Sequence, residues 1–203
     1  GLFQVTRLAS TGAGEDARWS GHASYEELLA QAKARVWIDL RFYSPTAFRE
    51  QTPRGGRSKP RNCDFADPIR CFQSWVNRWN AFSALPIDRE RLLAFVNNHA
   101  RVDRIDSRAR MLDYGRYRQR GFVGTCQFHF LEDVVGDDSF LDDDLPAPWE
   151  DGLDDPPPVY PPPVPGPIEE DRLQEVNLLA DFAFYCGTGY KTTMGMGQTR
   201  RQG

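Results

Sequence analysis

The chain has 203 residues, 40% of them apolar, so it can bury a core in one or two domains. No apolar run is long enough to cross a membrane. The four cysteines, at positions 63, 71, 126 and 186, form no CxxC pair and are not evenly spaced, which disfavours a zinc site or a disulfide framework. This pattern indicates reduced thiols in a cytoplasm. The net charge is −4, but it is unevenly distributed, because residues 132–171 hold fourteen acidic residues and no Lys or Arg. The rest of the chain therefore carries 25 basic against 15 acidic residues, a balance typical of nucleic-acid-binding proteins.

The first segment, residues 1–22, is polar and rich in glycine. Because the chain begins at Gly1 and not at a methionine, we expect a connector from a missing N-terminal domain. A capping box of Ser24 and Glu27 then predicts a short helix over residues 25–33.

Alternating apolar residues predict a strand over residues 36–42, which Ser44-Pro45 should end. Residues 50–62 are basic and rich in proline and glycine, which predicts a flexible loop. An N-cap at Asp67 followed by proline begins a core helix over residues 68–82, and a second helix follows over residues 88–98. The first of these helices has apolar residues at helical spacing: Ile69, Phe72, Val76, Trp79 and Phe82.

Two strands, residues 101–112 and 116–131, form a hairpin about the turn Asp113-Tyr114-Gly115. The second strand places apolar residues on one face: Phe122, Cys126, Phe128 and Phe130. Strand alternation also places Arg116, Arg118 and Arg120 on one side, beside Tyr114 and Tyr117. Arginine pairs with phosphates and tyrosine stacks on bases, so this run favours RNA contact.

The alternative for the hairpin is a solvated outer face whose arginines pair with Asp103, Asp106 and Asp113. For the arginines before the turn this alternative is at least as good as RNA contact. For the run after the turn, which has no acidic neighbour in the sequence, RNA contact is favoured.

Residues 132–167 are acidic and then proline-rich, with few apolar side chains. We expect an insert without packed structure, extended as polyproline II, rather than a ligand for an SH3-like domain. An acidic first turn then predicts a helix over residues 169–186, and a short strand near residues 198–202 ends the chain.

The elements occur in the order βαββαβ, with the helix at residues 88–98 as an addition. This order predicts an α+β, ferredoxin-like domain, RRM-like in topology, formed by residues 23–131 and 168–203. Its predicted core includes Phe72, Trp79, Phe128 and Phe184. The aromatic strand motif of RNA-recognition modules is absent.

Four glycines follow the last helix within eleven residues, at 187, 189, 195 and 197, around Tyr190, Lys191, Thr192 and Thr193. Such a loop can bend round an anion and present bare N–H groups, supplemented by lysine and threonine. A Walker loop would follow a strand and open a helix, whereas this loop follows a helix, so an extended polyanion such as RNA is favoured over a nucleoside triphosphate. The alternative is a glycine C-cap at Gly187 with an idle loop after it.

Four segments resemble a known family: 42–48 (FYSPTAF), 78–82 (RWNAF), 119–124 (QRGFVG) and 189–198 (GYKTTMGMGQ). They are similar to the C-terminal domain of the precursor-crRNA-processing endoribonuclease of the RAMP superfamily, the sixth family of CRISPR-associated proteins, over residues 20–201. The resemblance implies two ferredoxin-like domains, metal-free cleavage that leaves a 2′,3′-cyclic phosphate, no cofactor, and CRISPR repeat RNA or crRNA as the partner. It also implies RNA contact by the glycine-rich segment: Gly187, Gly189, Tyr190, Lys191, Thr192, Thr193, Gly195, Gly197 and Gln198.

Metal-free cleavage needs a base for the ribose 2′-hydroxyl and an acid for the leaving 5′-oxygen. In the family that this chain resembles, the histidine usually lies in the N-terminal domain. Of the three histidines here, we expect His99 and His129 to be structural and His22 to lie in an entry segment, so no catalytic residue is assigned. The alternative function is a non-catalytic RAMP subunit that holds crRNA in an effector complex, with other CRISPR-associated proteins or fused domains as partners.

Overall fold

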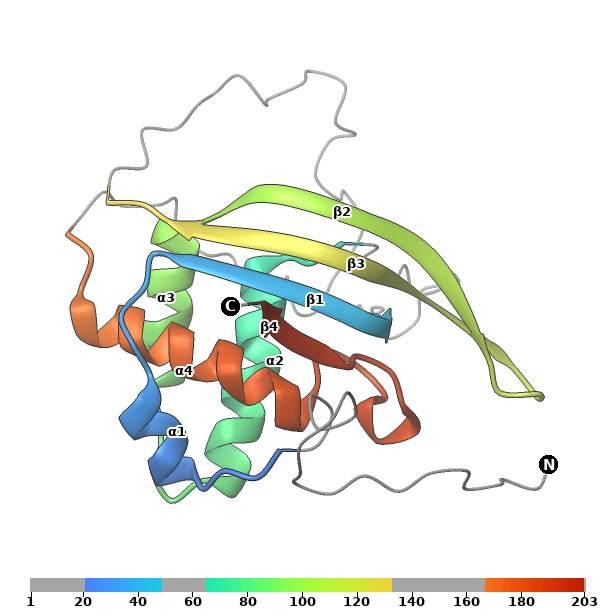
Figure 1. Ribbon diagram of the computed structural model, residues 1–203, viewed down its shortest axis with the longest axis horizontal. Coiled ribbons are helices and arrows are strands. Elements are labelled where there is room, and N and C mark those ends of the chain that lie inside the picture. The colour runs from blue at the N-terminus through green and yellow to red at the C-terminus, as the bar shows by residue number, and fades with distance from the viewer. Residues whose placement is uncertain (1–20, 49–64, 133–166, 203) are drawn as a thin grey trace, which may run out of the picture.

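A four-stranded antiparallel sheet forms one layer of the molecule, and helices cover one of its faces (Figure 1). The computed structural model describes residues 21–48, 65–132 and 167–202. The strands lie in the order β2-β3-β1-β4. Their bounds are Trp37–Thr46 (β1), Ala100–Asp113 (β2), Arg118–Phe130 (β3) and Thr199–Gln202 (β4).

The helices follow the capping signals of the sequence. Ser24 and Glu27 form the expected capping box, and the carboxylates of Asp67 and Asp88 each accept a hydrogen bond from a backbone N–H of the first helical turn. The helices are Tyr25–Gln31 (α1), Pro68–Phe82 (α2), Arg89–His99 (α3) and Glu170–Cys186 (α4), with a 3-10 turn at Thr192–Met194 (η3).

The chain order and the strand order are those of the expected βαββαβ arrangement, with α3 added between α2 and β2. Along each central strand, side chains point alternately toward the helices and toward the open face of the sheet. Residues Ile38, Leu40 and Phe42 of β1 are buried against the helices, opposite even-numbered residues of β3. The α+β prediction is therefore confirmed.

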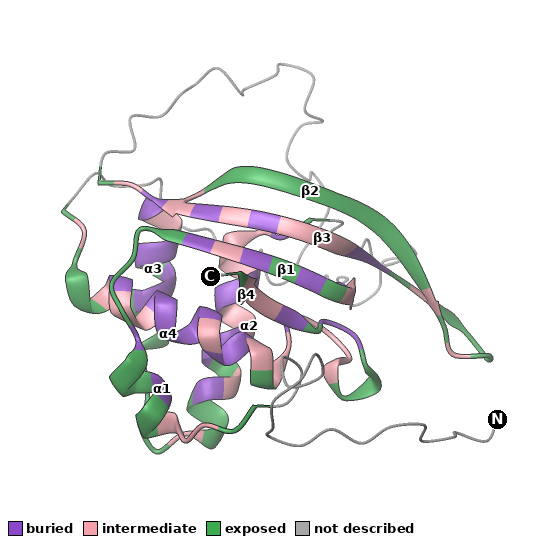
Figure 2. Cartoon of the chain, viewed as in Figure 1, coloured by how far each residue is buried: buried purple, intermediate pink, exposed green. Residues whose placement is uncertain are grey.

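Aromatic rings fill the space between the sheet and the helices, where buried residues concentrate in Figure 2. Trp75, Trp79 and Phe72 of α2 are fully buried. The ring of Trp79 meets Tyr25 of α1 and Phe182 of α4 edge to face, at 5.0 and 5.3 Å between centroids. Such pairs add stability beyond the area that they bury.

Three expectations about the elements are wrong. β1 does not end at Ser44-Pro45 but continues to Thr46, because its ladder with β3 changes register between Phe42 and Thr46 and so accommodates the proline. Phe82 is 74% exposed, because it is the last residue of α2. Phe184 is only half-buried beside Tyr185, and Phe182 points into the core instead.

Several predicted segments lie outside the described residues: nearly all of the connector, the basic loop at 50–62 and the insert between Glu132 and Pro167. Among the helices that the structure describes, none is long and apolar enough to span a membrane.

Candidate functional site

The glycine-rich segment after α4 is anchored by a buried chain of hydrogen bonds. The indole N–H of Trp75 donates to Oγ1 of Thr188 (2.9 Å), which lies 2.7 Å from Oγ1 of Thr199. The Thr199 hydroxyl also lies 2.9 Å from the carbonyl oxygen of Gly197. Both threonines are fully buried, so the two ends of the loop are joined to each other and to α2.

Backbone bonds then fix the loop against the end of β1. Tyr190 N–H donates to the carbonyl of Ala47 (2.8 Å), and Gly197 N–H donates to the carbonyl of Pro45 (3.0 Å). Across the loop, Thr188 N–H donates to the carbonyl of Gly197 (2.8 Å). The segment 42–48, singled out in the sequence, is therefore the surface on which the loop rests.

The glycines themselves do not supply the free N–H groups of the loop. Gly187, Gly189, Gly195 and Gly197 each donate their N–H to an acceptor within the protein. Glycine is needed at these positions for positive φ and, at two of them, for close packing: a Cβ would lie 2.4 Å from the Ala47 oxygen at position 189 and 2.0 Å from the Thr188 oxygen at position 197.

Within residues 187–198, the N–H groups that donate to no described residue belong to Lys191, Thr192 and Thr193. Lys191 has left-handed backbone angles (φ 57°, ψ 35°) and the 3-10 turn follows directly. A left-handed residue followed by a right-handed turn directs successive N–H groups toward one point, the geometry of an anion-binding nest.

Arg78 of α2 clamps the loop from below. Its guanidinium donates to the Gly189 carbonyl (2.6 Å), lies 3.4 Å from Oγ1 of Thr192, and bonds the hydroxyl and carbonyl oxygens of Ser74. The Ser74 hydroxyl in turn accepts the Gly189 N–H (2.9 Å). No local pattern predicts this role, because Gly189 and Thr192 lie more than a hundred residues from Arg78 in the sequence.

The tip of the β2–β3 hairpin meets the loop around Lys191. The Lys191 ammonium lies 4.1 Å from the ring centroid of Tyr117, 5.0 Å from that of Tyr190 and 5.6 Å from that of Tyr114. It also lies 3.4 Å from Oε1 of Gln119, and the Tyr114 hydroxyl donates to the Met194 carbonyl (3.1 Å). We call Tyr114, Tyr117, Gln119, Tyr190 and Lys191 the tyrosine–lysine cluster.

Electrostatics keep Lys191 charged in this cluster. Desolvation lowers the pKa of its ammonium, but hydrogen bonds and charge interactions with Tyr117 and Tyr190 outweigh it, so the pKa lies above its ordinary value. Burial, together with repulsion from Tyr117 and Tyr190, raises the pKa of Tyr114, and the charge of Lys191 opposes this rise. The cluster therefore holds a cation among three aromatic rings.

The arginines after the turn occupy different environments. Arg116 precedes β3 and lies in the turn, so strand alternation does not govern it. The expectation that this run has no acidic neighbour is wrong for Arg118, whose Nε lies 3.0 Å from Oδ2 of Asp113. By alternation Arg118 and Arg120 lie on the side of β3 opposite to Gln119, so they are not part of the tyrosine–lysine cluster.

The histidines lie elsewhere. His99 is buried, with Nδ1 2.8 Å from the Leu131 carbonyl, and the ring of His129 stacks on Trp37. His22 is exposed in the segment before α1. The described part of the chain contains no group of three or more His, Cys, Asp or Glu side chains that could hold a metal.

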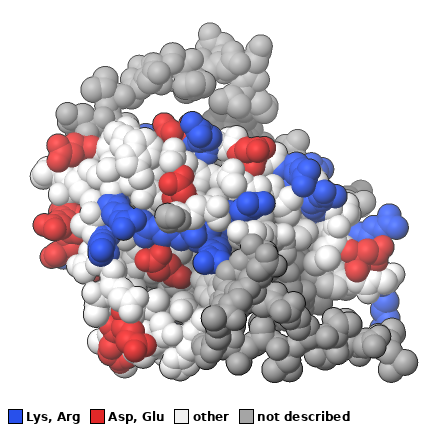
Figure 3. Space-filling view, in the orientation of Figure 1, with Lys and Arg blue, Asp and Glu red and all other residues white. Residues whose placement is uncertain are grey.

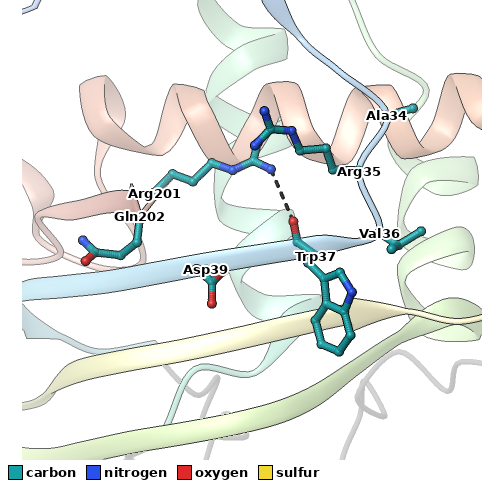
Figure 4. Close-up of a pocket in the computed structure, with 7 residues that line it drawn as sticks. All are labelled: Ala34, Arg35, Val36, Trp37, Asp39, Arg201 and Gln202. Carbon is teal, nitrogen blue, oxygen red and sulfur yellow. Dashed lines mark hydrogen bonds between the residues drawn. The ribbon is translucent and has the colours of Figure 1, made fainter.

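An open hollow of about 460 Å³ lies beside β1 and the end of β4 (Figure 4). Arg201 spans it, with donors 3.3 Å from the Trp37 carbonyl and 2.5 Å from Oδ1 of Asn177, and it pairs with Asp181 at 3.4 Å. Burial raises the pKa of Asp181, and Arg201 opposes that effect. The hollow is lined by Ala34, Arg35, Val36, Trp37, Asp39, Arg201 and Gln202.

Comparison with known proteins gives a family match and structural neighbours. The family model of CRISPR-associated endoribonuclease Cas6 matches residues 40–199. A Cas6 product complex has a TM-score of 0.67 and 22% identity and covers 93% of this chain and 58% of its own. Cas6 from Thermus thermophilus has a TM-score of 0.61 and 23% identity, with coverages of 91% and 60%.

A Cas6 substrate mimic complex gives a TM-score of 0.59 and 22% identity, with coverages of 95% and 62%. At these identities the neighbours establish the fold. This chain spans about three fifths of the length of the structures that it matches. No curated protein sequence matches it.

Proposed function

Because the chain belongs to the family of the CRISPR-associated endoribonuclease Cas6, we propose that it is the RNA-binding domain of an enzyme that cuts precursor CRISPR RNA within its repeats. Structural neighbours were solved as product and substrate-mimic complexes, which supports RNA as the ligand. The proposed partner is CRISPR repeat RNA or crRNA, bound without a cofactor in the cytoplasm, alone or with other CRISPR-associated proteins.

The observation that carries this proposal is the contact between the hairpin and the glycine-rich loop. The sequence analysis assigned RNA contact to each of them separately, and the tyrosine–lysine cluster joins them into one surface. A cation held among exposed aromatic rings suits RNA, because the ammonium pairs with phosphate and the rings stack on bases. An idle loop after a helix C-cap would not need this contact.

Each part of the surface has a distinct proposed role. Lys191 binds a backbone phosphate, with the N–H groups of residues 191–193 directed at its oxygens. Thr192, Thr193 and Gln198 add side-chain hydrogen bonds. Arg116 and Arg120 pair with phosphates farther along the RNA. The glycines act indirectly, because they allow the loop to fold against Ala47 and Thr188.

The proposed reaction is metal-independent transesterification. A base removes the 2′-hydroxyl proton, the 2′-oxygen attacks the adjacent phosphorus, and an acid protonates the leaving 5′-oxygen, which yields a 2′,3′-cyclic phosphate. Within this chain, the proposed contribution is to fix the scissile strand by its phosphates, because correct positioning supplies a large part of such a rate enhancement.

The test is incubation of the full-length protein with its labelled repeat RNA in EDTA, followed by mapping of the product ends. We expect one cut within the repeat and a 2′,3′-cyclic phosphate, with repeat RNA affinity reduced roughly tenfold in Lys191→Ala. The matched control is Lys33→Ala, a lysine just after α1, which should bind normally.

Two outcomes would separate the alternatives. Tight binding of repeat RNA without any cut would favour a non-catalytic RAMP subunit that holds crRNA. Normal binding by Lys191→Ala, with cleavage intact, would show that the tyrosine–lysine cluster does not bind the RNA.

A further inference from the structure

The face of the sheet that the helices leave open carries a basic and aromatic surface. Because Ile38, Leu40 and Phe42 point into the core, alternation places Trp37, Asp39, Arg41 and Tyr43 on this open face. The pairing registers extend the surface across the strands: Trp37 lies opposite His129, and His129 lies opposite Arg101.

Arginine dominates the charge of this open face. Two further sets of cross-strand neighbours continue this surface. Gln127 of β3 pairs with Asp39 of β1 and Arg104 of β2, and Arg41 of β1 pairs with Thr125 of β3 and Arg200 of β4. Four arginines of this face, Arg41, Arg104, Arg108 and Arg110, stand with the acidic side chains Asp39 and Asp106. Two further arginines turn away from it: the Arg101 guanidinium donates to carbonyl oxygens at the end of α3, and the Arg200 guanidinium lies 6.0 Å from the ring centroid of Phe184 in α4. Figure 3 shows basic side chains over the strands and along the hairpin, with acidic groups among them.

Two aromatic side chains stand on this surface. Trp37 is 40% exposed and stacks flat on His129, with ring centroids 3.6 Å apart at 9°. Tyr43 is 37% exposed, and the Arg41 guanidinium lies 4.9 Å from its ring centroid. In Figure 4 the Trp37 indole lies on the other side of β1 from the guanidinium groups of Arg35 and Arg201.

We propose that this open face binds a single-stranded segment of RNA, with bases stacked on Trp37 and Tyr43 and phosphates paired with the arginines. The inference deepens the proposed function and rests on it for the class of ligand. Exposed rings interleaved with arginine are the elements of single-strand binding. Here the two rings stand on β1, a central strand, and the arginines stand on β1 and β2.

The side chains of this face argue against a protein partner. The core of a protein interface is apolar and poor in charge. Here β1, β3 and β4 present Asp39, Arg41, Thr125, Gln127 and Gln202 between the rings, and Gln127 donates to Asp39 (2.6 Å). A surface of this kind suits a hydrated polyanion better than an apolar partner.

The test is titration of fluorescein-labelled oligouridine with the full-length protein at fixed salt. Trp37→Ala should weaken binding roughly tenfold, the effect of losing one base–aromatic stack, whereas Trp37→Phe should keep most of the affinity. Arg41→Ala should lower the salt dependence by about one counterion. The matched control is Phe82→Ala, an exposed aromatic at the end of α2, which should bind as the parent does.

Thermal melts and a second titration with repeat RNA separate the outcomes. Unchanged oligouridine affinity in Trp37→Ala would overturn the proposal, and a lowered melting temperature with it would show that Trp37 serves the fold through its stack on His129. If the parent protein binds repeat RNA but not oligouridine, this proposal fails and the proposed function stands. If oligouridine binds through Trp37 while repeat RNA is neither preferred nor cut, the proposed function fails instead.

Discussion

At the residue scale, two glycines of the loop do different work although both have positive φ. A Cβ at position 197 would lie 2.0 Å from the Thr188 carbonyl oxygen, within the buried anchor of the loop. A Cβ at position 195 would meet nothing within 4 Å, and only its φ of 84° opposes a side chain. Position 197 is therefore a packing constraint, and position 195 is a purely conformational one.

We therefore expect Gly197→Ala to destabilise the fold by more than about 3 kcal/mol, because backbone must move to admit the methyl group. Gly195→Ala should cost only about 1 kcal/mol, the strain of a left-handed alanine, and Gly195→Asn less. Urea unfolding followed by circular dichroism measures all three. Equal costs at 195 and 197 would contradict the close contact at Thr188.

Two thiols give a second prediction at this scale. Desolvation raises the pKa of Cys126 and of Cys186 to about 12, with a repulsive charge at Asp39 adding to the effect at Cys126. The folded protein thus keeps these protons at a pH where the unfolded chain, with pKa values near 9, releases them. Stability is therefore complete below about pH 9 and falls as the pH rises through the window from 9 to 12.

The expected loss between pH 8 and pH 10 is about 1 kcal/mol per thiol, measured by urea unfolding at the two values. Because the thiolate is the reactive form, both cysteines should also react with a disulfide reagent at pH 8 at least about a hundredfold more slowly than in the denatured protein. A Cys126→Ala, Cys186→Ala variant provides the control, since it should lose this part of the pH dependence. Rapid labelling of the native protein would show that these sulfurs are accessible.

At the element scale, the hairpin extends beyond the core and presents two different surfaces. Near its tip Tyr117 and Gln119 contact Lys191, whereas Arg118 turns to the other side and pairs with Asp113. Exposed pairs of this kind contribute little stability, but they reduce the charge available to a ligand. The three arginines after the turn should therefore contribute unequally to RNA binding.

Arg116→Ala and Arg120→Ala together should weaken RNA binding and lower the salt slope by between about one and two counterions, because each phosphate contact releases close to one. Arg118→Ala is the matched control and should change the slope less, since Asp113 already balances its charge. Titrations against repeat RNA at several salt concentrations measure both. An equal effect of Arg118→Ala would mean that its pair opens when RNA binds.

Local signals predicted most of these elements, and they failed where distant segments meet. The capping box at Ser24, the Asp67-Pro68 start of α2 and the alternation of β3 each depend on neighbours in sequence, so they could be read directly. The path of β1 past Pro45 depends on pairing with β3, which no local pattern encodes. The glycines could be found, but not the clamp by Arg78 or the use of their N–H groups.

At the scale of the whole molecule, charge is divided along the chain. Residues 137–164 contain nine acidic residues and no Lys or Arg, so their removal changes the formal net charge from −4 to +5. The described core is built from elements on both sides of this segment: β1, α2 and β3 before it and α4 after it. We therefore expect deletion of residues 137–164 to leave the fold intact.

The same deletion should strengthen non-specific RNA binding, because the acidic segment repels phosphate and competes for the arginines of the hairpin and sheet. The gain should be greatest at low salt and fade as screening increases. Replacing the nine acidic residues by Asn and Gln is the matched control, since it removes the charge but keeps the length, and it should reproduce the gain. If only the deletion strengthens binding, the segment acts by obstruction, and if circular dichroism shows unfolding, it is part of the fold.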